Sequence, residues 1–126
     1  MFNEFFKELE KKPKILWALI FLYMSGIFYL SSLSYPPQPA GGIKHAPIIE
    51  HFIEFFILGT LLFLGFRSLK FHERAFLFSI ILGIFYACTD EFHQLFVSGR
   101  CAELFDVFID SLGVFSAVLL MRFKLK

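Results

Sequence analysis

Four long apolar runs, separated by charged or turn-forming residues, constrain the fold of this chain more than any other feature. The first, Ile15–Ser32, carries no charge and holds about 18 residues, enough to cross a bilayer as an α-helix. With 57% hydrophobic residues and 20 phenylalanines, the chain is too apolar for a soluble core. We therefore predict an all-α membrane protein, a single domain over residues 1–126, with four transmembrane helices. The predicted spans are residues 15–32, 48–66, 75–96 and 104–121.

The segment before the first span, residues 1–14, places apolar residues at helical spacing among glutamates and lysines. These apolar residues are Phe2, Phe5, Phe6 and Leu9. The pattern predicts a short amphipathic helix that lies in the headgroup layer, with a solvated, frayed end as the alternative. A cleaved signal peptide is the rival interpretation of the first span, but the apolar run is long for one, which favours an uncleaved anchor.

Basic residues concentrate on one side of the predicted membrane. Ten of the 12 lysines and arginines precede the first span, join the second span to the third, or follow the fourth. The other two are Lys44 and Arg100. The positive-inside rule then predicts a multi-pass protein whose N-terminus and C-terminus are both cytoplasmic. Seven of the 11 acidic residues fall in the outer half, which is therefore net negative.

Acidic residues inside a span are costly in lipid, so they must face one another or a water-filled cavity. Counted at ~1.5 Å per residue from the basic borders at Arg67 and Arg122, Glu54 and Asp110 both lie roughly 18 to 20 Å deep. We therefore predict an acidic pocket, open to the outer side and floored by Glu54 and Asp110. Its candidate residues are His51, Glu54, Asp90, Glu91, His93, Gln94, Arg100, Glu103, Asp106 and Asp110.

Carboxylates this close together repel, so the pocket needs a compensating charge. Arg100 is the best candidate because its guanidinium can bridge two carboxylates, with shared protons and a bound divalent cation as alternatives. No metal ligands are assigned, because Cys88 and Cys101 form neither a CxxC pair nor a zinc-like cluster. We expect these two thiols to be unpaired, with a disulfide as the alternative. The sequence does not identify a cofactor.

The polar stretch Thr89–Gly113 resembles the VanZ-like family of small bacterial integral membrane proteins. The matching motifs are TDEFHQLFVSGR and AELFDVFIDSLG, with HFIEFFILGTLL as a weaker second match. The shared positions are His51, Glu54, Gly59, Asp90, Glu91, Gln94, Gly99, Arg100, Asp106, Asp110 and Gly113. The chain departs from the family at Ile48, Phe55 and Ser98, where many members have Lys, Tyr and Pro. The family is named for a member that gives low-level resistance to the glycopeptide teicoplanin. The resemblance implies four spans, the bacterial cell membrane and a cell-envelope role.

Several functions remain open at this point. The first hypothesis is a binding protein, linked to teicoplanin-type antibiotic resistance, whose pocket captures a glycopeptide or a lipid-linked cell-wall precursor. The alternative is an intramembrane hydrolase or transferase that acts on a lipid-linked envelope precursor, with Glu54 or Asp110 as general base. A cation-coupled transporter and a purely structural polar network are further alternatives.

The chain has no basic-aromatic patch of the kind that binds nucleic acid, and the lipid bilayer is its expected surrounding. The sequence leaves oligomerisation open. We expect Gly59 and Gly113 to pack helices against each other rather than to contact a ligand.

Overall fold

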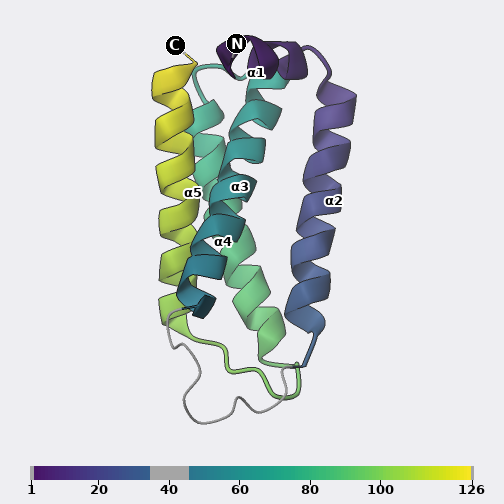
Figure 1. Ribbon diagram of the computed structural model, residues 1–126, viewed down its shortest axis with the longest axis vertical. Helices are drawn as coiled ribbons and strands as arrows, with labels where there is room; N and C mark the ends of the chain where they lie inside the picture. The colour runs from purple at the N-terminus through teal and green to yellow at the C-terminus, as the bar shows by residue number, and fades with distance from the viewer. Residues whose placement is uncertain (1, 35–45, 126) are drawn as a thin grey trace.

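The computed structural model describes residues 2–34 and 46–125, and every regular element within them is an α-helix. The helices are α1 (Phe2–Glu10), α2 (Pro13–Ser32), α3 (Ala46–Ser68), α4 (Ala75–Gln94) and α5 (Leu104–Lys124). Helices α2 to α5 form an up-and-down bundle and are long and apolar enough to cross a membrane (Figure 1). The predicted helical class and its four long apolar helices are therefore confirmed. The predicted loop residue Lys44 lies outside the described residues.

The ends of the helices differ in part from the prediction. Helix α4 stops at Gln94 rather than at residue 96, because the chain tightens into a turn there. The Phe96 N–H donates to the His93 carbonyl at 3.0 Å, three residues back, and Gly99 then adopts a φ of 79° that favours glycine. Helices α3 and α5 instead continue past their predicted ends, through the basic residues that border the apolar runs.

Helices α3 and α5 pack closely against each other, and two glycines allow their backbones to approach. A Cβ atom on Gly59 would lie 2.9 Å from the Val114 Cα, and a Cβ atom on Gly113 would lie 2.6 Å from the Phe52 carbonyl oxygen. Both distances are shorter than side chains tolerate, so any larger residue would push the helices apart. The prediction that Gly59 and Gly113 serve helix packing is confirmed.

Helix α2 lies at the side of the bundle and is tied to α3 by side-chain hydrogen bonds (Figure 1). Trp17 Nε1 donates to the Gly65 carbonyl at 3.1 Å, and the Tyr23 hydroxyl donates to the Glu54 carbonyl at 2.9 Å. These bonds hold α2 in place although much of the space between α2 and α3 is a pocket, described below.

Helix α1 lies across one end of the bundle, at the same end as the C-terminus (Figure 1). Its Phe6 and Leu9 side chains pack against the core of the bundle. Glu10 forms an ion pair with Arg67 of α3, with 2.7 Å between Oε1 and Nε. Glu4 and Lys7 remain exposed on the outer side of the helix. An amphipathic helix held in this way suits the predicted position at the membrane surface.

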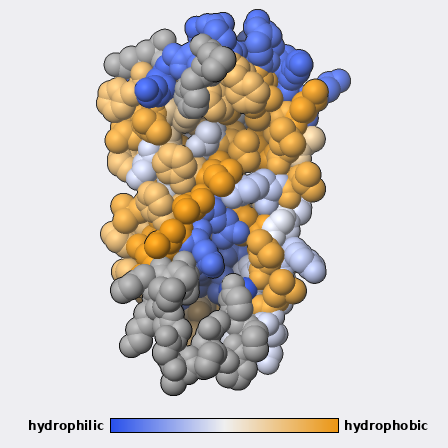
Figure 2. All heavy atoms as spheres, viewed as in Figure 1, coloured by the Kyte–Doolittle hydropathy of each residue, from blue (hydrophilic) through white to orange (hydrophobic). Residues whose placement is uncertain are grey.

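Large apolar side chains cover the flanks of the four long helices. Phe21, Phe85 and Phe108 are 68%, 64% and 57% exposed, which is unfavourable in water but favourable in lipid. Figure 2 shows hydrophobic residues along the length of the molecule and hydrophilic residues gathered at the α1 end. The basic residues of the segments that meet at this end are Lys7, Lys11, Lys12, Lys14, Arg67, Lys70, Arg74, Arg122 and Lys124.

Candidate functional site

Helices α3 and α5 each bring a polar side chain to the interior of the bundle. His51 Nδ1 lies 2.9 Å from Asp110 Oδ1, and Asp110 is fully buried. Gly113, one turn farther along α5, brings the α5 backbone against Phe52, the neighbour of His51. The same close contact between the two helices therefore sets the distance between the histidine and the aspartate. Polar groups from separate helices therefore meet inside the bundle, although the pair is His51–Asp110 rather than Glu54 and Asp110, which were predicted at the same depth.

Glu91 of α4 completes a cluster with this pair, and we call His51, Glu91 and Asp110 the buried triad. One potential ligand atom from each of the three residues lies within 4.8 Å of the other two. Glu91 Oε2 accepts a hydrogen bond from the Glu103 backbone N–H at 3.1 Å. Within residues 2–34 and 46–125, Glu91 Oε1 and Asp110 Oδ2 are buried and accept no hydrogen bond.

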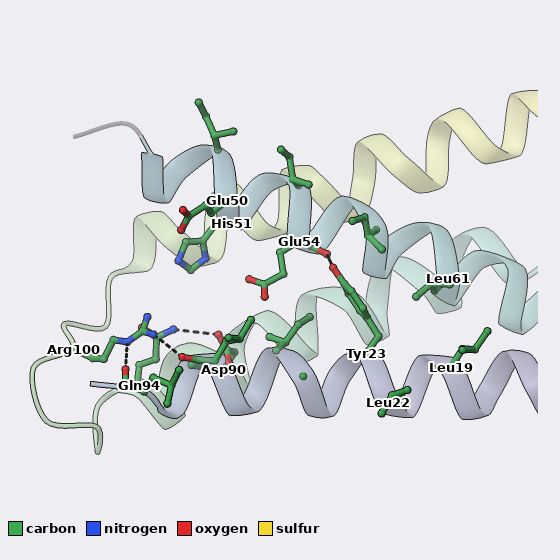
Figure 3. A pocket seen from close by; sticks show the side chains of 18 residues that line it. Leu19, Leu22, Tyr23, Glu50, His51, Glu54, Leu61, Asp90, Gln94 and Arg100 are labelled. Carbon is green, nitrogen blue, oxygen red and sulfur yellow. Dashed lines mark hydrogen bonds between the residues drawn. The ribbon is translucent and has the colours of Figure 1, made fainter. Parts of the chain in front are cut away.

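A pocket of about 910 Å³ lies between α2 and α3 and reaches the last turn of α4 (Figure 3). We call it the α2–α3 pocket. Its polar lining residues are Tyr23, Ser31, Glu50, His51, Glu54, Asp90, Gln94 and Arg100. Its apolar lining is larger and comprises Leu19, Leu22, Gly26, Ile27, Leu30, Leu33, Ile49, Ile53, Ile57 and Leu61. Figure 2 shows part of a hydrophilic hollow between hydrophobic flanks, in the half of the molecule farther from α1.

The polar residues of the α2–α3 pocket gather at one end of it. Glu54 of α3 and Asp90 of α4 extend toward each other, whereas Leu19 and Leu61 lie at the other end (Figure 3). Gln94 Nε2 donates to Asp90 Oδ2 at 3.2 Å, which orients that carboxylate. The pocket is therefore amphipathic along its length, with an acidic end and an apolar end.

Arg100 lies at the acidic end and contacts the end of α2. Its Nε donates to the Leu33 carbonyl at 3.0 Å, and its Nη2 donates to the Leu30 carbonyl at 2.7 Å. The last carbonyl groups of a helix have no partner within the helix, so the guanidinium caps α2 and holds it at the pocket. The sequence-based hypothesis of a bridge between two carboxylates did not foresee these backbone acceptors.

Three further predicted residues lie beside the pocket rather than in its lining. His93 Nε2 is 2.9 Å from Ser32 Oγ, and its ring stacks on Phe28 with 4.2 Å between centroids. These contacts fasten α4 to α2. Glu103 is exposed and contacts the buried triad through its backbone N–H. Asp106 is half-buried and within electrostatic reach of the triad.

The predicted floor of the pocket is divided between two places. Glu54 lines the α2–α3 pocket as expected. Asp110 is not among the described lining residues and is instead buried against His51, between α3 and α5. Counting residues along each helix predicts the depth of a side chain, but not the rotation of the helix that decides which neighbour it faces.

The contribution of α2 to the pocket was not predicted from the sequence. Its lining residues Leu19, Tyr23, Gly26 and Leu30 recur along one face of the helix. None of them is charged, so the polar signal that marked the other helices was absent. In the sequence, only the small Gly26 and the polar Tyr23, three residues apart, indicate that this face of α2 lines a pocket. Outside this pocket, the two thiols of the chain are free and exposed.

Comparison with known proteins gives one match. A family model described as VanZ/LLP1 matches residues 14–125, which covers α2 to α5 and the loops between them. No curated protein and no solved structure shows a significant match to the chain.

Proposed function

The chain belongs to the VanZ/LLP1 family, and from this premise we propose that it binds an amphiphilic cell-envelope molecule in the α2–α3 pocket. The ligand has a cationic or polyhydroxyl head and a lipid chain, as in an acylated glycopeptide or a lipid-linked cell-wall precursor. Binding such a molecule at the membrane surface is the basis of a role in teicoplanin-type resistance. The observation that carries the proposal is the pocket's division into an acidic end and an apolar end.

The apolar end of the pocket suits a lipid chain. Leu19, Leu22, Ile57 and Leu61 line it from two helices, and Leu22 is 70% exposed on the flank of α2. A chain can therefore enter sideways from the bilayer without crossing a polar surface. Ligand sites of this kind use apolar walls for affinity and a few polar groups for orientation.

The acidic end selects the head group. Glu50, Glu54 and Asp90 provide carboxylate oxygens that accept hydrogen bonds from ammonium or sugar hydroxyl groups. Three carboxylates disfavour an anionic head in direct contact with them. The head is therefore a cationic or sugar-like group, and any phosphate of the ligand lies near Arg100 at the rim.

In this proposal the pocket opens to the outer side of the membrane, and the distribution of basic residues supports that orientation. The basic segments meet at the α1 end, which the positive-inside rule assigns to the cytoplasm. The polar end of the pocket lies in the other half of the bundle, near the α4–α5 loop. An outward pocket can meet glycopeptides and cell-wall precursors, which act outside the cytoplasm.

Binding measured on purified protein in detergent tests the proposal. Teicoplanin and a lipid-linked cell-wall precursor are titrated separately, and each is repeated with its lipid chain removed. We expect saturable binding of at least one acylated ligand, with a loss of about tenfold or more in affinity for Glu54→Gln and for Asp90→Asn. Glu73→Gln, in the exposed turn at the other end, serves as the matched control. Equal affinity in all proteins contradicts the proposal.

An intramembrane enzyme is the second candidate function, and the hydrogen-bonded His51–Asp110 pair favours it. A buried carboxylate that orients an imidazole is a common arrangement for a general base. His51 also lines the α2–α3 pocket, so it can reach a bound head group. Conversion of a lipid-linked precursor by the purified protein, followed by mass spectrometry and abolished in His51→Gln, supports this function; an unchanged precursor rejects it.

A further inference from the structure

The buried triad points to a site that the proposed binding function does not require. We propose that His51, Glu91 and Asp110 bind one divalent transition-metal ion of the zinc class between α3, α4 and α5. The proposal concerns a different place from the α2–α3 pocket, although His51 belongs to both. It also assigns specific ligands to a divalent cation, which the sequence offered only as one alternative for balancing the acidic residues.

The geometry of the triad is close to that of a three-ligand site. One nitrogen or oxygen atom from each residue lies within 4.8 Å of the others, and His51 Nδ1 and Asp110 Oδ1 are 2.9 Å apart. Bonds of ~2.1 Å to a tetrahedral ion place neighbouring ligand atoms roughly 3.4 Å apart. Binding an ion therefore requires the His51 and Asp110 ligand atoms to move apart by roughly 0.5 Å and any more distant ligand atom to approach.

Two buried oxygens of the triad are without hydrogen-bond donors among the described residues. These oxygens are Glu91 Oε1 and Asp110 Oδ2, and their residues are 5% and 0% exposed. Burial of an unsatisfied carboxylate oxygen is costly, and native proteins offset that cost with a donor, a water molecule or an ion. Glu91 and Asp110 belong to the same cluster as the His51 imidazole. One bound cation could therefore interact with both carboxylates and with the imidazole nitrogen.

The charges of the triad also fit a divalent ion. Two carboxylates and a neutral imidazole carry two negative charges, which a divalent cation neutralises in the low-dielectric interior. Within the described part of the chain, Asp110 is hydrogen-bonded to His51, and no lysine or arginine forms an ion pair with Asp110 or Glu91. Arg100 donates hydrogen bonds to two backbone carbonyl groups at the end of α2.

The donor set favours zinc or a similar ion over magnesium. Imidazole nitrogen suits Zn²⁺ and other first-row transition metals, whereas Mg²⁺ prefers oxygen ligands and retains several waters. Three protein ligands leave one position for water or a substrate group, as in catalytic zinc sites. Contacts around the triad already orient it: the Glu103 N–H holds Glu91 Oε2, which is the role of outer contacts at metal sites.

Metal titration of the purified full chain tests the proposal. The affinity tag is removed, bound metal is stripped with a chelator, and Zn²⁺, Mn²⁺ and Mg²⁺ are titrated by calorimetry, with Co²⁺ absorption as a spectroscopic probe of the ligand geometry. We expect one Zn²⁺ per chain, a rise in thermal stability on binding, and intense Co²⁺ bands. Glu91→Gln and Asp110→Asn each weaken Zn²⁺ binding by about tenfold or more. Glu73→Gln removes an exposed carboxylate at the other end of the bundle and leaves the affinity unchanged.

Either of two results would overturn the proposal. The first is an equal Zn²⁺ affinity for wild type and Glu91→Gln. The second is the absence, in wild type, of the absorption bands of protein-bound Co²⁺. Circular dichroism checks that each variant keeps its helices. If Asp110→Asn does not fold, Glu91→Gln and the Co²⁺ spectrum of wild type decide the question. No glycopeptide or lipid ligand is present, so failure of the metal site is distinguishable from failure of the proposed ligand binding.

Discussion

His51 of α3 and Asp110 of α5 are 59 residues apart in the chain, yet His51 Nδ1 lies 2.9 Å from Asp110 Oδ1. The pair links the α2–α3 pocket to the buried triad, because His51 belongs to both and Asp110 belongs to the triad. A change at either residue should therefore affect stability, metal binding and the polar end of the pocket together.

The His51–Asp110 pair should show strong energetic coupling. His51→Leu leaves the Asp110 carboxylate buried without its partner and should lower the free energy of unfolding by roughly 3 to 5 kcal/mol. The double variant His51→Leu/Asp110→Leu should recover most of that loss, because both polar groups are then removed. Unfolding in detergent with a chelator present is measured for the single variants His51→Leu and Asp110→Leu and for the double variant. Effects that simply add would show that the two side chains do not interact.

The close approach of α3 and α5 should depend on Gly113. In Gly113→Ala, the new Cβ atom would meet the Phe52 carbonyl oxygen at 2.6 Å, and backbone atoms cannot move aside cheaply. We expect a loss of about 1 to 3 kcal/mol in the free energy of unfolding, which is typical of overpacking. Gly26→Ala is the matched control, since nothing lies within 4 Å of its added Cβ atom. It should leave stability unchanged or raise it by up to ~1 kcal/mol, because alanine favours helix. Similar losses at both positions would contradict this description of the packing.

A large side chain introduced at Gly26 should block the α2–α3 pocket. Gly26→Trp places an indole beside Tyr23 and Ile27, where an added side chain has room. We predict that this variant keeps its thermal stability and loses binding of acylated ligands, whereas Gly26→Ala keeps both. Ligand titration and a melting curve on the same preparation measure the two effects. If Gly26→Trp binds acylated ligands as tightly as wild type, the lipid chain does not occupy this pocket.

The orientation in the membrane should be visible through Cys101, a free and exposed thiol in the α4–α5 loop. In a Cys88→Ser background, a membrane-impermeant maleimide should label Cys101 on intact cells. A second protein, with His72→Cys added and Cys101→Ser, should be labelled only after the cells are permeabilised, because His72 lies in the exposed turn at the basic end. The reverse pattern of labelling would invert the topology and place the pocket on the cytoplasmic side.

Much of the fold could be predicted because lipid imposes simple rules on sequence. Apolar runs of sufficient length predicted the four long helices, and the spacing of Phe6 and Leu9 predicted that α1 is amphipathic. Counting along helices predicted that Glu54 and Asp110 lie at similar depths; polar groups of α3, α4 and α5 do meet, but as the buried triad, to which Glu54 does not belong. The cost of isolated charges in lipid makes such clustering predictable.

The rest depended on the rotation and contacts of each helix, which residue counting does not determine. Glu54 and Asp110 have similar depths, yet Glu54 faces α2 and Asp110 faces α3. Arg100 was assigned to carboxylates because its charge is the obvious feature, but unpaired carbonyl groups at the end of α2 also need donors. The pocket wall on α2 carries no charge at all, so no polar pattern marked it.

Photo-crosslinking of an acylated ligand tests the proposed binding site most directly. A teicoplanin analogue with a diazirine in its acyl chain is bound to the purified protein and irradiated, and the labelled peptides are identified by mass spectrometry. We predict saturable labelling of the pocket faces of α2 and α3, around Leu22 and Ile57, which excess unlabelled ligand suppresses. Labelling spread over the outer flanks of α4 and α5, such as Phe85 and Phe108, without competition by unlabelled ligand, would contradict a ligand site between α2 and α3.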